Sequence, residues 1–351
     1  MNGHANIVGA GLIGGSIALG LGRDGWTVSI IDSDPARVAT AIERGVAVES
    51  GLRRDATLTV IATPVSAIVE AARAALADTV GVVTDVGSVK ESVVAEIDDP
   101  RFVGGHPMAG SELDGLDGAD ADMFSGAAWV LTPGDSTADK AFATVSAMVR
   151  SLGADMITMD ARRHDEMVAM VSHVPHLAAV TLMGLASERA EDQGVLLRLA
   201  AGGFRDMTRI AAGHPGIWPD ICAQNRRAIV ETLDAYLTAL TELRSSVLGG
   251  DSDRLVDVLE RARTARLNLP QSAPPAAELS ELRIPVLDRR GELAAVATLA
   301  TDLGINVYDI EIAHSVEGAR GVISLIVDSV PAETLIEQLR EQGYKPSARE
   351  L

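Results

Sequence analysis

The sequence predicts an α/β protein with a parallel-sheet domain first, a helical domain next and a small α+β domain last. Short apolar strands alternate with helical patterns over residues 1–155, which is typical of a parallel sheet flanked by helices. The hydrophobic period becomes helical over residues 156–266. Residues 267–282 are rich in Pro, Ala and Ser and predict a linker. Residues 283–351 then return to a compact βαββαβ pattern.

Apolar runs and helical periodicity place the individual elements. The strands of the first domain are predicted at residues 5–9, 27–31, 57–62, 80–85, 101–104 and 127–132. The helices of the second domain are predicted after Asp160 through His164 and Met170, and at residues 174–191, 194–212, 217–248 and 251–266. In the third domain we expect strands at 282–287, 306–313 and 320–328, and helices at 292–303 and 331–342.

A glycine-rich turn follows the first predicted strand, in the run Gly9-Ala10-Gly11-Leu12-Ile13-Gly14. Gly9 permits a tight turn, Gly11 lets a pyrophosphate approach the backbone, and Gly14 lets the next helix lie close to the strand. The helix N-terminus offers N–H groups and a partial positive charge to the phosphates. With a strand before it and a helix after it, the turn predicts a Rossmann-type dinucleotide site, against the alternative of a glycine turn without a ligand.

An acid closes the second predicted strand. Asp32 can accept hydrogen bonds from the adenosine ribose hydroxyls and would repel a 2′-phosphate. Ser33 and Asp34 follow it, rather than Arg or Lys. We therefore expect NAD as the cofactor in preference to NADP. Thr63 and Pro64 follow the third predicted strand and are predicted to line the same cofactor site.

Composition and charge exclude several classes of partner. The formal charge of −19 disfavours nucleic acids and anionic membranes. An anionic substrate must therefore be gathered by a local basic site. The single cysteine, Cys222, rules out an intramolecular disulfide framework and a multi-cysteine zinc site. We recognise no signal peptide and no uninterrupted apolar run of about 18 residues, so we expect a cytoplasmic protein.

Two further clusters follow predicted strands, where ligands gather in open α/β sheets. Ser88, in the run Asp85-Val86-Gly87-Ser88-Val89-Lys90, is predicted to lie beside the nicotinamide, with a helix cap as the alternative. His106, in the run Gly105-His106-Pro107-Met108-Ala109-Gly110-Ser111-Glu112, is predicted to take a proton from an alcohol while hydride leaves. A buried structural histidine is the alternative for His106. Glu112 is predicted to orient a cationic histidine or gate the substrate, unless it is a solvated loop acid.

The third cluster is helical. Arg205 and Arg209 are four residues apart and share a helix face, close to Gly202 and Trp218. A guanidinium fork matches a carboxylate bidentately, so Arg209 is predicted to bind a substrate carboxylate. For Arg205 we expect a surface ion pair with its neighbour in sequence, Asp206.

The histidines of the helical domain raise the question of a metal. His173 and His176 are three residues apart across Pro175, and no carboxylate stands at a zincin position. We therefore expect no catalytic metal.

These runs resemble the prephenate dehydrogenase family of tyrosine biosynthesis. The resemblance rests on the turn at 9–16, the strand end at 85–90 and the loop at 105–112, together with the runs Ser172-His173-Val174-Pro175-His176 and Gly203-Phe204-Arg205-Asp206-Met207-Thr208-Arg209-Ile210-Ala211 followed by Trp218. It covers residues 5 to about 265, and the motifs occur in the family's order. The tail resembles an ACT domain, which some members of the family carry, through the runs Asp288-Arg289-Arg290-Gly291-Glu292-Leu293 and Gly304-Ile305-Asn306-Val307.

The resemblance implies a reaction and a set of roles. NAD would take hydride from the ring carbon that bears the hydroxyl, and the ring carboxylate would leave as CO2. His106 would accept a hydrogen bond from the ring hydroxyl with help from Ser88, and Arg209 would bind a substrate carboxylate. The remaining residues expected in the substrate pocket are His176, Ser111, Glu112, Gly202 and Trp218. Prephenate would yield 4-hydroxyphenylpyruvate, and arogenate would yield tyrosine.

Two other classes of function stay open. Another dehydrogenase with a Rossmann-type domain and a helical domain, acting on a hydroxy acid or an imine, commonly needs a catalytic lysine on the helices. The sequence has no lysine between Lys140 and Lys345, which counts against it. The other class is an NAD-sensing or amino-acid-sensing regulatory protein.

Two partners are expected besides the substrate. Long helices after a Rossmann-type domain often pair between subunits, so we expect a homodimer. In the ACT-like tail we expect tyrosine, or another aromatic amino acid, to bind near Gly291 and Asn306 and to lower activity.

Overall fold

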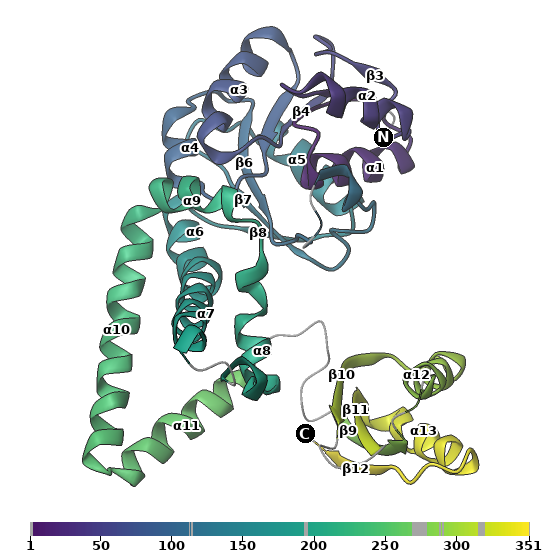
Figure 1. Ribbon diagram of the computed structural model, residues 1–351. Helices are drawn as coiled ribbons and strands as arrows, with labels where there is room; N and C mark the ends of the chain where they lie inside the picture. Colours follow the sequence, from purple (N-terminus) through teal and green to yellow (C-terminus); the bar gives the residue numbers. More distant parts are fainter. Residues whose placement is uncertain are drawn as a thin grey trace. The chain divides into compact units, whose positions relative to one another are not determined.

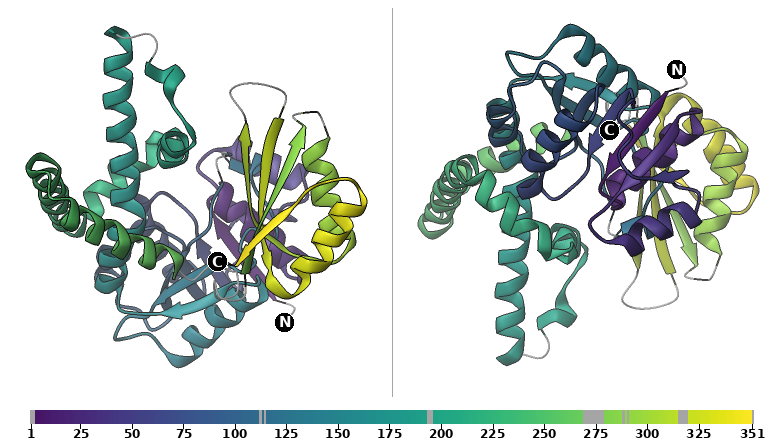
Figure 2. Two further views of the ribbon diagram at one scale, coloured as in Figure 1. Left: turned by 90° about the horizontal axis from the view of Figure 1, so that it is seen from below. Right: turned by 90° about the horizontal axis from the view of Figure 1, so that it is seen from above.

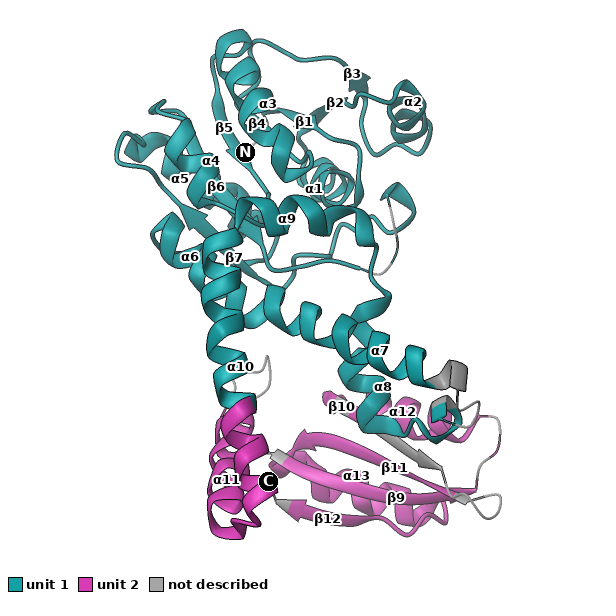
Figure 3. Ribbon diagram, turned by 60° about the vertical axis from the view of Figure 1, so that its left-hand side comes forward, with its two compact units in different colours: residues 1–240 teal, residues 241–351 magenta. Residues whose placement is uncertain are grey.

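The computed structural model describes residues 3–111, 113, 115–192, 196–268, 279–287, 289, 291–314 and 320–350. The chain forms two compact units, residues 1–240 and 241–351 (Figure 3). Glu112 and residues 269–278 of the predicted linker lie outside the described residues. The predicted domain boundaries at residues 155 and 266 stay predictions.

An eight-stranded sheet organises the first unit (Figure 1). Its strands in chain order are β1 (His4–Val8), β2 (Thr27–Ile31), β3 (Glu49–Ser50), β4 (Leu58–Ile61), β5 (Val82–Asp85), β6 (Phe102–Pro107), β7 (Ala128–Thr132) and β8 (Asp155–Thr158). Their spatial order is β3-β2-β1-β4-β5-β6-β7-β8. All neighbours are parallel except β6 and β7, which are antiparallel. The predicted Rossmann-type sheet is confirmed, with two reversed strands added at one edge.

The path of β6 differs from the prediction. We expected a strand at 101–104 with His106 in the loop after it, but β6 continues through Pro107. The reason is the antiparallel neighbour β7, in which Val130 and Trp129 lie opposite His106 and Pro107. His106 is therefore held by a sheet ladder on this side rather than by a glycine loop.

Helices flank the sheet. They are α1 (Leu12–Arg23), α2 (Pro35–Glu43), α3 (Val65–Asp78), α4 (Glu91–Glu96) and α5 (Asp139–Ser151). The core between the layers is mostly aliphatic, and its buried aromatic residues are Phe102, Phe124 and Trp129, of which the last two have rings 5.0 Å apart. This agrees with a sequence in which only 3% of the residues are aromatic.

The rest of the first unit is helical. It contains α6 (Ala161–Val168), a π-helical turn (Ala169–His173), α7 (Val174–Asp192), α8 (Gly202–Thr208), α9 (Trp218–Gln224) and α10 (Arg226–Gly249), of which α10 runs into the second unit. The continuous helices predicted at 194–212 and 217–248 are wrong. The second is broken at Asn225, whose backbone leaves the helical region and whose side chain donates to the carbonyl of Asp165 at 2.9 Å. The first changes to a 3₁₀ turn at Arg209, after α8.

One helical stretch, Ala161–Arg189, is long and apolar enough to cross a membrane by length and composition alone. That test is weak, because core helices of soluble proteins pass it too. The stretch is interrupted by the π-helical turn just before Pro175, which lacks the N–H that would continue the α-helical ladder. Its first turns also bury His164 and Asp165, which hydrogen bond to the sheet domain.

The second unit contains α11 (Ser252–Leu267) and a small α+β fold. The fold runs β9 (Leu279–Leu287), α12 (Glu292–Asp302), β10 (Val307–His314), β11 (Arg320–Asp328), α13 (Ser329–Glu341) and β12 (Ser347–Glu350). The strands form an antiparallel sheet in the order β10-β11-β9-β12, with both helices on one face (Figure 2). The predicted βαββαβ order is confirmed. The first strand begins three residues early, because Leu279 already pairs with Asp328 of β11.

Candidate active site

The sheet brings most of the predicted site residues to one edge. Strands β1, β2, β4, β5 and β6 are parallel, so their carboxyl ends lie at the same side of the sheet. The segments that follow these ends contain Gly9, Asp32, Thr63 and Ser88. His106 is the second-last residue of β6. In an open α/β sheet this edge is where a dinucleotide binds.

The glycine turn fits a dinucleotide in its local geometry. Gly9 has φ +112°, and a Cβ there would collide with the backbone of Ala62. A Cβ on Gly14 would collide with the carbonyl of Gly9, so the close packing of α1 on the turn requires glycine. Around Gly11, in contrast, a Cβ would meet nothing within 4 Å. Gly11 is the N-cap of α1 and supplies no side-chain cap, so no capping side chain competes with a phosphate for the first N–H groups of the helix.

Asp32 is fixed beside this turn by two backbone hydrogen bonds. One carboxylate oxygen accepts from the N–H of Ala10 at 2.7 Å, and the other accepts from the N–H of Asp34 at 2.9 Å. Each oxygen keeps a further lone pair for a ribose hydroxyl. Thr63 lies on the other side of Gly9, and its buried Oγ1 has no hydrogen-bond partner among the described residues. A buried hydroxyl without a partner fits a site that is completed by a ligand.

A histidine pair lies at the end of β6. Nδ1 of His106 is 2.9 Å from Nε2 of His164, and Nδ1 of His164 is 2.7 Å from a carboxylate oxygen of Asp165. His164 and Asp165 are each only 1% exposed. Burial lowers the pKa of His106 well below its ordinary value, and the neighbouring His164, Lys90 and His173 lower it further. His106 is therefore neutral near pH 7 and able to accept a proton.

The segment that carries Ser88 is anchored by the same acid. The two carboxylate oxygens of Asp165 accept from the N–H groups of Lys90 and Glu91, each at 2.8 Å. Asp165 thus satisfies the first N–H groups of α4, whose N-cap is Lys90. The alternative that Ser88 caps this helix is wrong, because α4 begins three residues after it.

Lys90 and Asp85 form an ion pair below the Ser88 segment, and both side chains are fully buried. Asp85 also accepts from the N–H of Gly87 at 2.8 Å and from the N–H of Gly105 at 3.2 Å. Burial lowers the pKa of Lys90, while the charge of Asp85 raises it. The pair ties the segment after β5 to β6, next to His106.

Aromatic rings gather on the helical side. The ring of His176 stacks on Trp218 with centroids 3.7 Å apart, and His173 meets Trp218 edge-on at 6.1 Å. Burial lowers the pKa of His176 and lowers that of His173 to about 4. Both imidazoles are thus neutral near pH 7 and form an apolar wall with the indole.

The arginines of the helical domain are exposed at the end of α8. Arg209 is the C-cap of α8 and starts the 3₁₀ turn that packs on α7. Arg205 donates to the carbonyl of Ala200 at 3.2 Å, and the ion pair predicted with Asp206 is not formed. Gly202 begins α8 and is exposed. Ser111 accepts from the N–H of Leu113 at 3.1 Å, and in the described part of the chain no hydrogen bond links it to His106. Substrate contacts of these residues stay predictions.

The sequence reasoning missed four residues that hold the site together: Asp85, Lys90, His164 and Asp165. The first two stand in the run quoted for Ser88, and the last two lie in the middle of α6, a helix that was expected after Asp160. Charged residues in apolar surroundings were the available signal. Their partners are far away in sequence, so the pattern alone did not assign them a role.

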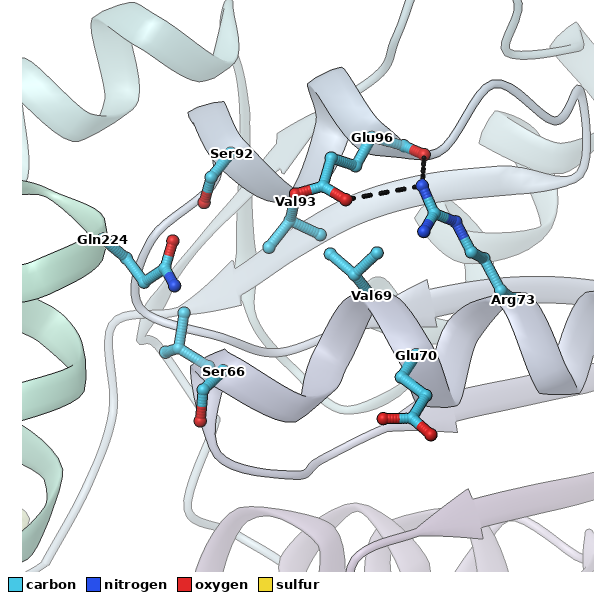
Figure 4. Close-up of a pocket in the computed structure, with 9 residues that line it drawn as sticks. Ser66, Val69, Glu70, Arg73, Ser92, Val93, Glu96 and Gln224 are labelled. Atoms are coloured by element: carbon cyan, nitrogen blue, oxygen red, sulfur yellow. Dashed lines mark hydrogen bonds and ion pairs between the residues drawn. The ribbon is translucent and has the colours of Figure 1, made fainter.

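A separate hollow of about 310 Å³ lies between α3, α4 and α9 (Figure 4). Its only arginine, Arg73, is already bonded to the carbonyl and carboxylate of Glu96. None of the predicted site residues lines it. We therefore do not assign the reaction to this hollow.

Comparison with known proteins decides the family. Residues 17–158 match the family model described as prephenate dehydrogenase, nucleotide-binding domain. Residues 160–261 match the model described as prephenate dehydrogenase, dimerization domain. A prephenate dehydrogenase of Bacillus subtilis is 31% identical, with 95% of each chain covered. The chain belongs to the prephenate dehydrogenase family.

Other known proteins are similar to this chain over three quarters of its length. A cyclohexadienyl dehydrogenase of Zymomonas mobilis is 34% identical, over 76% of this chain and 96% of its own length. The crystal structure of prephenate dehydrogenase from Aquifex aeolicus in complex with hydroxyphenyl propionate and NAD+ is 28% identical, with a TM-score of 0.72 over 77% of this chain and 99% of that one. That of Synechocystis arogenate dehydrogenase is 27% identical, with a TM-score of 0.67 over 75% and 98%.

Membership of the prephenate dehydrogenase family settles the class of protein. The predicted NAD-dependent oxidoreductase is confirmed, and the glycine turn, Asp32 and Thr63 described above fit NAD. The two alternative classes of function, a dehydrogenase of another family and a purely sensing protein, are therefore excluded. The helical part of the chain carries the dimerisation domain of the family.

Proposed function

We propose that this chain, as a cytoplasmic homodimer, converts prephenate to 4-hydroxyphenylpyruvate by NAD-dependent oxidative decarboxylation. The observation that carries the proposal is a neutral His106 at the same carboxyl edge of the sheet as the dinucleotide turn, in a chain of the prephenate dehydrogenase family. NAD supplies the hydride acceptor. The residues of the chain have to orient the ring, bind its carboxylates and move one proton.

His106 takes the proton of the ring hydroxyl during the reaction and returns it at the end. Nε2 of His106 takes the ring hydroxyl proton as the carbon–hydrogen pair leaves as hydride, so a carbon–oxygen double bond develops. The bond to the ring carboxylate then breaks, CO2 leaves, and its electron pair makes the ring aromatic. The ring oxygen takes the proton back from His106, so no net proton is consumed. Orientation and general-base catalysis account for most of the rate.

The other predicted residues have supporting roles. Ser88, anchored through Lys90 and Asp165, donates or accepts at the same hydroxyl. His176 and Trp218 form a stacked wall against the substrate ring. Arg209 binds a substrate carboxylate, which a chain of net charge −19 must otherwise repel.

A direct assay tests this function. NADH formation at 340 nm is followed with prephenate and NAD, and His106→Ala should lower kcat by roughly 10²–10⁴-fold, the usual contribution of a general base. NAD affinity should change little, because the cofactor turn is untouched. A His106→Ala enzyme with near-normal kcat would show that another group is the base. Absence of turnover by the wild type would refute the proposed function.

Arogenate is the alternative substrate, favoured by the likeness to an arogenate dehydrogenase. The two compounds differ only in a keto group against an ammonium on the side chain. Steady-state kinetics with both compounds, compared by kcat/KM, decides between them.

For the tail we propose feedback by tyrosine or another aromatic amino acid. Gly291 has φ +97° and begins α12, so a ligand can approach backbone N–H groups there. Asn306 is exposed just before β10. Control requires the ligand to bind two states of the protein differently, by about 1–3 kcal/mol for a typical coupling.

A further inference from the structure

The hydrogen bonds around Asp165 fix which of its neighbours carry protons. Its oxygens accept from two backbone N–H groups, those of Lys90 and Glu91, which can only donate. The third partner, Nδ1 of His164, lies 2.7 Å from the oxygen that also accepts from Lys90. A carboxylate in this setting is an acceptor towards all three groups, so Nδ1 of His164 carries a proton.

That assignment passes on to His106. A neutral imidazole has one N–H and one lone pair, so Nε2 of His164 is then an acceptor. The atom opposite it, 2.9 Å away, is Nδ1 of His106, which must donate. Nε2 of His106 is consequently left with its lone pair. The three side chains thus act as a directed chain of donors and acceptors that ends at Nε2.

We propose that His164 and Asp165 are positioning residues that hold His106 in the tautomer with Nδ1 protonated, so that Nε2 is the base that faces the substrate. This inference rests on the proposed function. Neither residue touches the substrate in this arrangement, since both are 1% exposed and lie behind His106. Without them His106 could turn its N–H toward the substrate hydroxyl, and its unprotonated nitrogen would then face away.

The pair also carries charge during the reaction. When Nε2 of His106 takes the hydroxyl proton, its Nδ1 proton can pass to Nε2 of His164. The positive charge then lies next to the carboxylate of Asp165, and both protons return when the ring oxygen is reprotonated. A buried carboxylate in contact with an imidazole stabilises such a cation at a site from which water is excluded.

Other charged groups surround His106 and have to be included. Lys90, after β5, and His173, on the π-helical turn, both lower the pKa of His106. Asp85, on β5, neutralises Lys90 and bonds to the N–H of Gly105, next to His106. Asp165 is the remaining anion of the cluster, and it is linked to His106 through His164. Its loss would therefore remove the anion that stabilises positive charge on the His106–His164 pair.

Two substitutions of His164 separate positioning from simple folding. Glutamine can place its amide oxygen near the position of Nε2 and accept from His106, whereas phenylalanine fills the space without an acceptor. We expect His164→Phe to lower kcat by roughly 10²-fold or more, as general-base removal does, with little change in the KM for prephenate. His164→Gln should be about tenfold more active than His164→Phe, the equivalent of one recovered hydrogen bond.

A matched control and a charge variant complete the series. His4→Gln makes the same chemical change in a histidine at the opposite end of β1 from the cofactor turn, and should leave kcat unchanged. Asp165→Asn removes the charge, so the acid limb of kcat/KM should move to lower pH while the maximal rate falls. Equal losses in His164→Gln and His164→Phe, or an equal loss in His4→Gln, would overturn the positioning role.

Nitrogen NMR reads the tautomer without any turnover. The chain has seven histidines, and the His106 signals are assigned by their loss in His106→Gln. We expect Nδ1 of His106 to be protonated and Nε2 to be bare in the wild type, and this pattern to be lost in His164→Phe. A wild-type His106 protonated at Nε2 would overturn the inference. Failure of the proposed function would instead show as no turnover of prephenate, with the NMR pattern intact.

Discussion

Lys90 and Asp85 form a fully buried ion pair between the two ends of the segment 85–90, which carries Ser88. The pair is not isolated, because Asp85 also accepts from the backbone of Gly87 and Gly105. It therefore connects the end of β5 to β6 at Gly105, the residue before His106. The sequence has no lysine between Lys140 and Lys345, so none lies in the helical domain. Lys90 lies in the sheet domain, where it holds the segments around the site together.

Removing the cation alone should destabilise the protein. Lys90→Met keeps most of the side-chain volume but leaves the carboxylate of Asp85 buried without its partner, which typically costs about 3–5 kcal/mol. Denaturant unfolding of the wild type and of Lys90→Met measures the difference in the free energy of unfolding. Lys140→Met, at an exposed position in the first turn of α5, is the matched control and should change the free energy of unfolding little. A loss below about 1 kcal/mol, the scale of a surface pair, would show that Asp85 is satisfied by the backbone alone.

The pH profile should report the neutral His106. Its pKa is lowered well below the ordinary value near 6.5, first by burial and then by His164, Lys90 and His173. A base must be unprotonated to act, so kcat/KM falls only when the pH drops through this lowered pKa. The acid limb should therefore have its midpoint below about 6.5. A midpoint at or above that value would mean that His106 is more exposed or better paired with an anion than the structure shows.

Asp32 should decide the choice of cofactor. Its two oxygens are held by the N–H groups of Ala10 and Asp34 and remain able to accept from ribose hydroxyls. Asp32→Ala should weaken NAD and narrow its advantage over NADP, measured as the ratio of kcat/KM for the two cofactors. Asp34→Ala, which removes an acid that caps α2 and pairs with Arg37 at 3.8 Å, is the control and should keep the ratio. Equal use of both cofactors by the wild type would contradict the assignment.

Arg209 and Arg205 offer a matched pair for substrate binding. If Arg209 binds a substrate carboxylate, Arg209→Ala should raise the KM for prephenate by roughly 30-fold or more, the equivalent of losing a desolvated charged contact. Arg205 donates to a carbonyl of its own segment, so Arg205→Ala should leave KM almost unchanged. Equal KM effects, or a fall in melting temperature with KM retained for Arg209→Ala, would make Arg209 a structural residue.

Local patterns predicted most of the fold, and long-range contacts account for what they missed. The apolar runs of β1, β2, β4 and β5 are buried on both faces, so their sequence alone identifies them. β8 is mostly exposed at the sheet edge and β3 has two residues, so neither leaves such a pattern. The glycines of β6 resembled a loop, because only pairing with β7 makes them a strand.

The same distinction holds for the site. Gly9, Gly11, Gly14 and Asp32 occur in a local motif whose geometry follows from the turn. The contact between His106 and His164 joins residues 58 positions apart, and that between Asp165 and Lys90 joins residues 75 apart. Hydrophobic periodicity carries no information on such pairs. Hydrophobic periodicity also did not predict the helix break at Asn225, which depends on a hydrogen bond to the buried carbonyl of Asp165.

The tail gives the last prediction. Its sheet has its own core of buried aliphatic residues, and Tyr344 and Arg289 both bond to Glu292 at the start of α12. The proposed ligand site near Gly291 is thus separate in sequence from every residue assigned to the chemistry. A chain ending at residue 268, after α11, should therefore keep its activity with prephenate and lose inhibition by tyrosine. The assay is NADH formation with and without tyrosine, for the full and shortened chains.

Three outcomes distinguish the roles of the tail. An active shortened enzyme without inhibition supports binding in the tail, and Gly291→Val in the full chain should then abolish inhibition too, because φ +97° strains a branched residue and its side chain would fill the approach to the helix N-terminus. An active shortened enzyme that is inhibited as strongly as the full chain places any feedback at the active site. An enzyme that loses both activity and its dimer, judged by light scattering, shows that the tail serves assembly and contradicts a purely regulatory role.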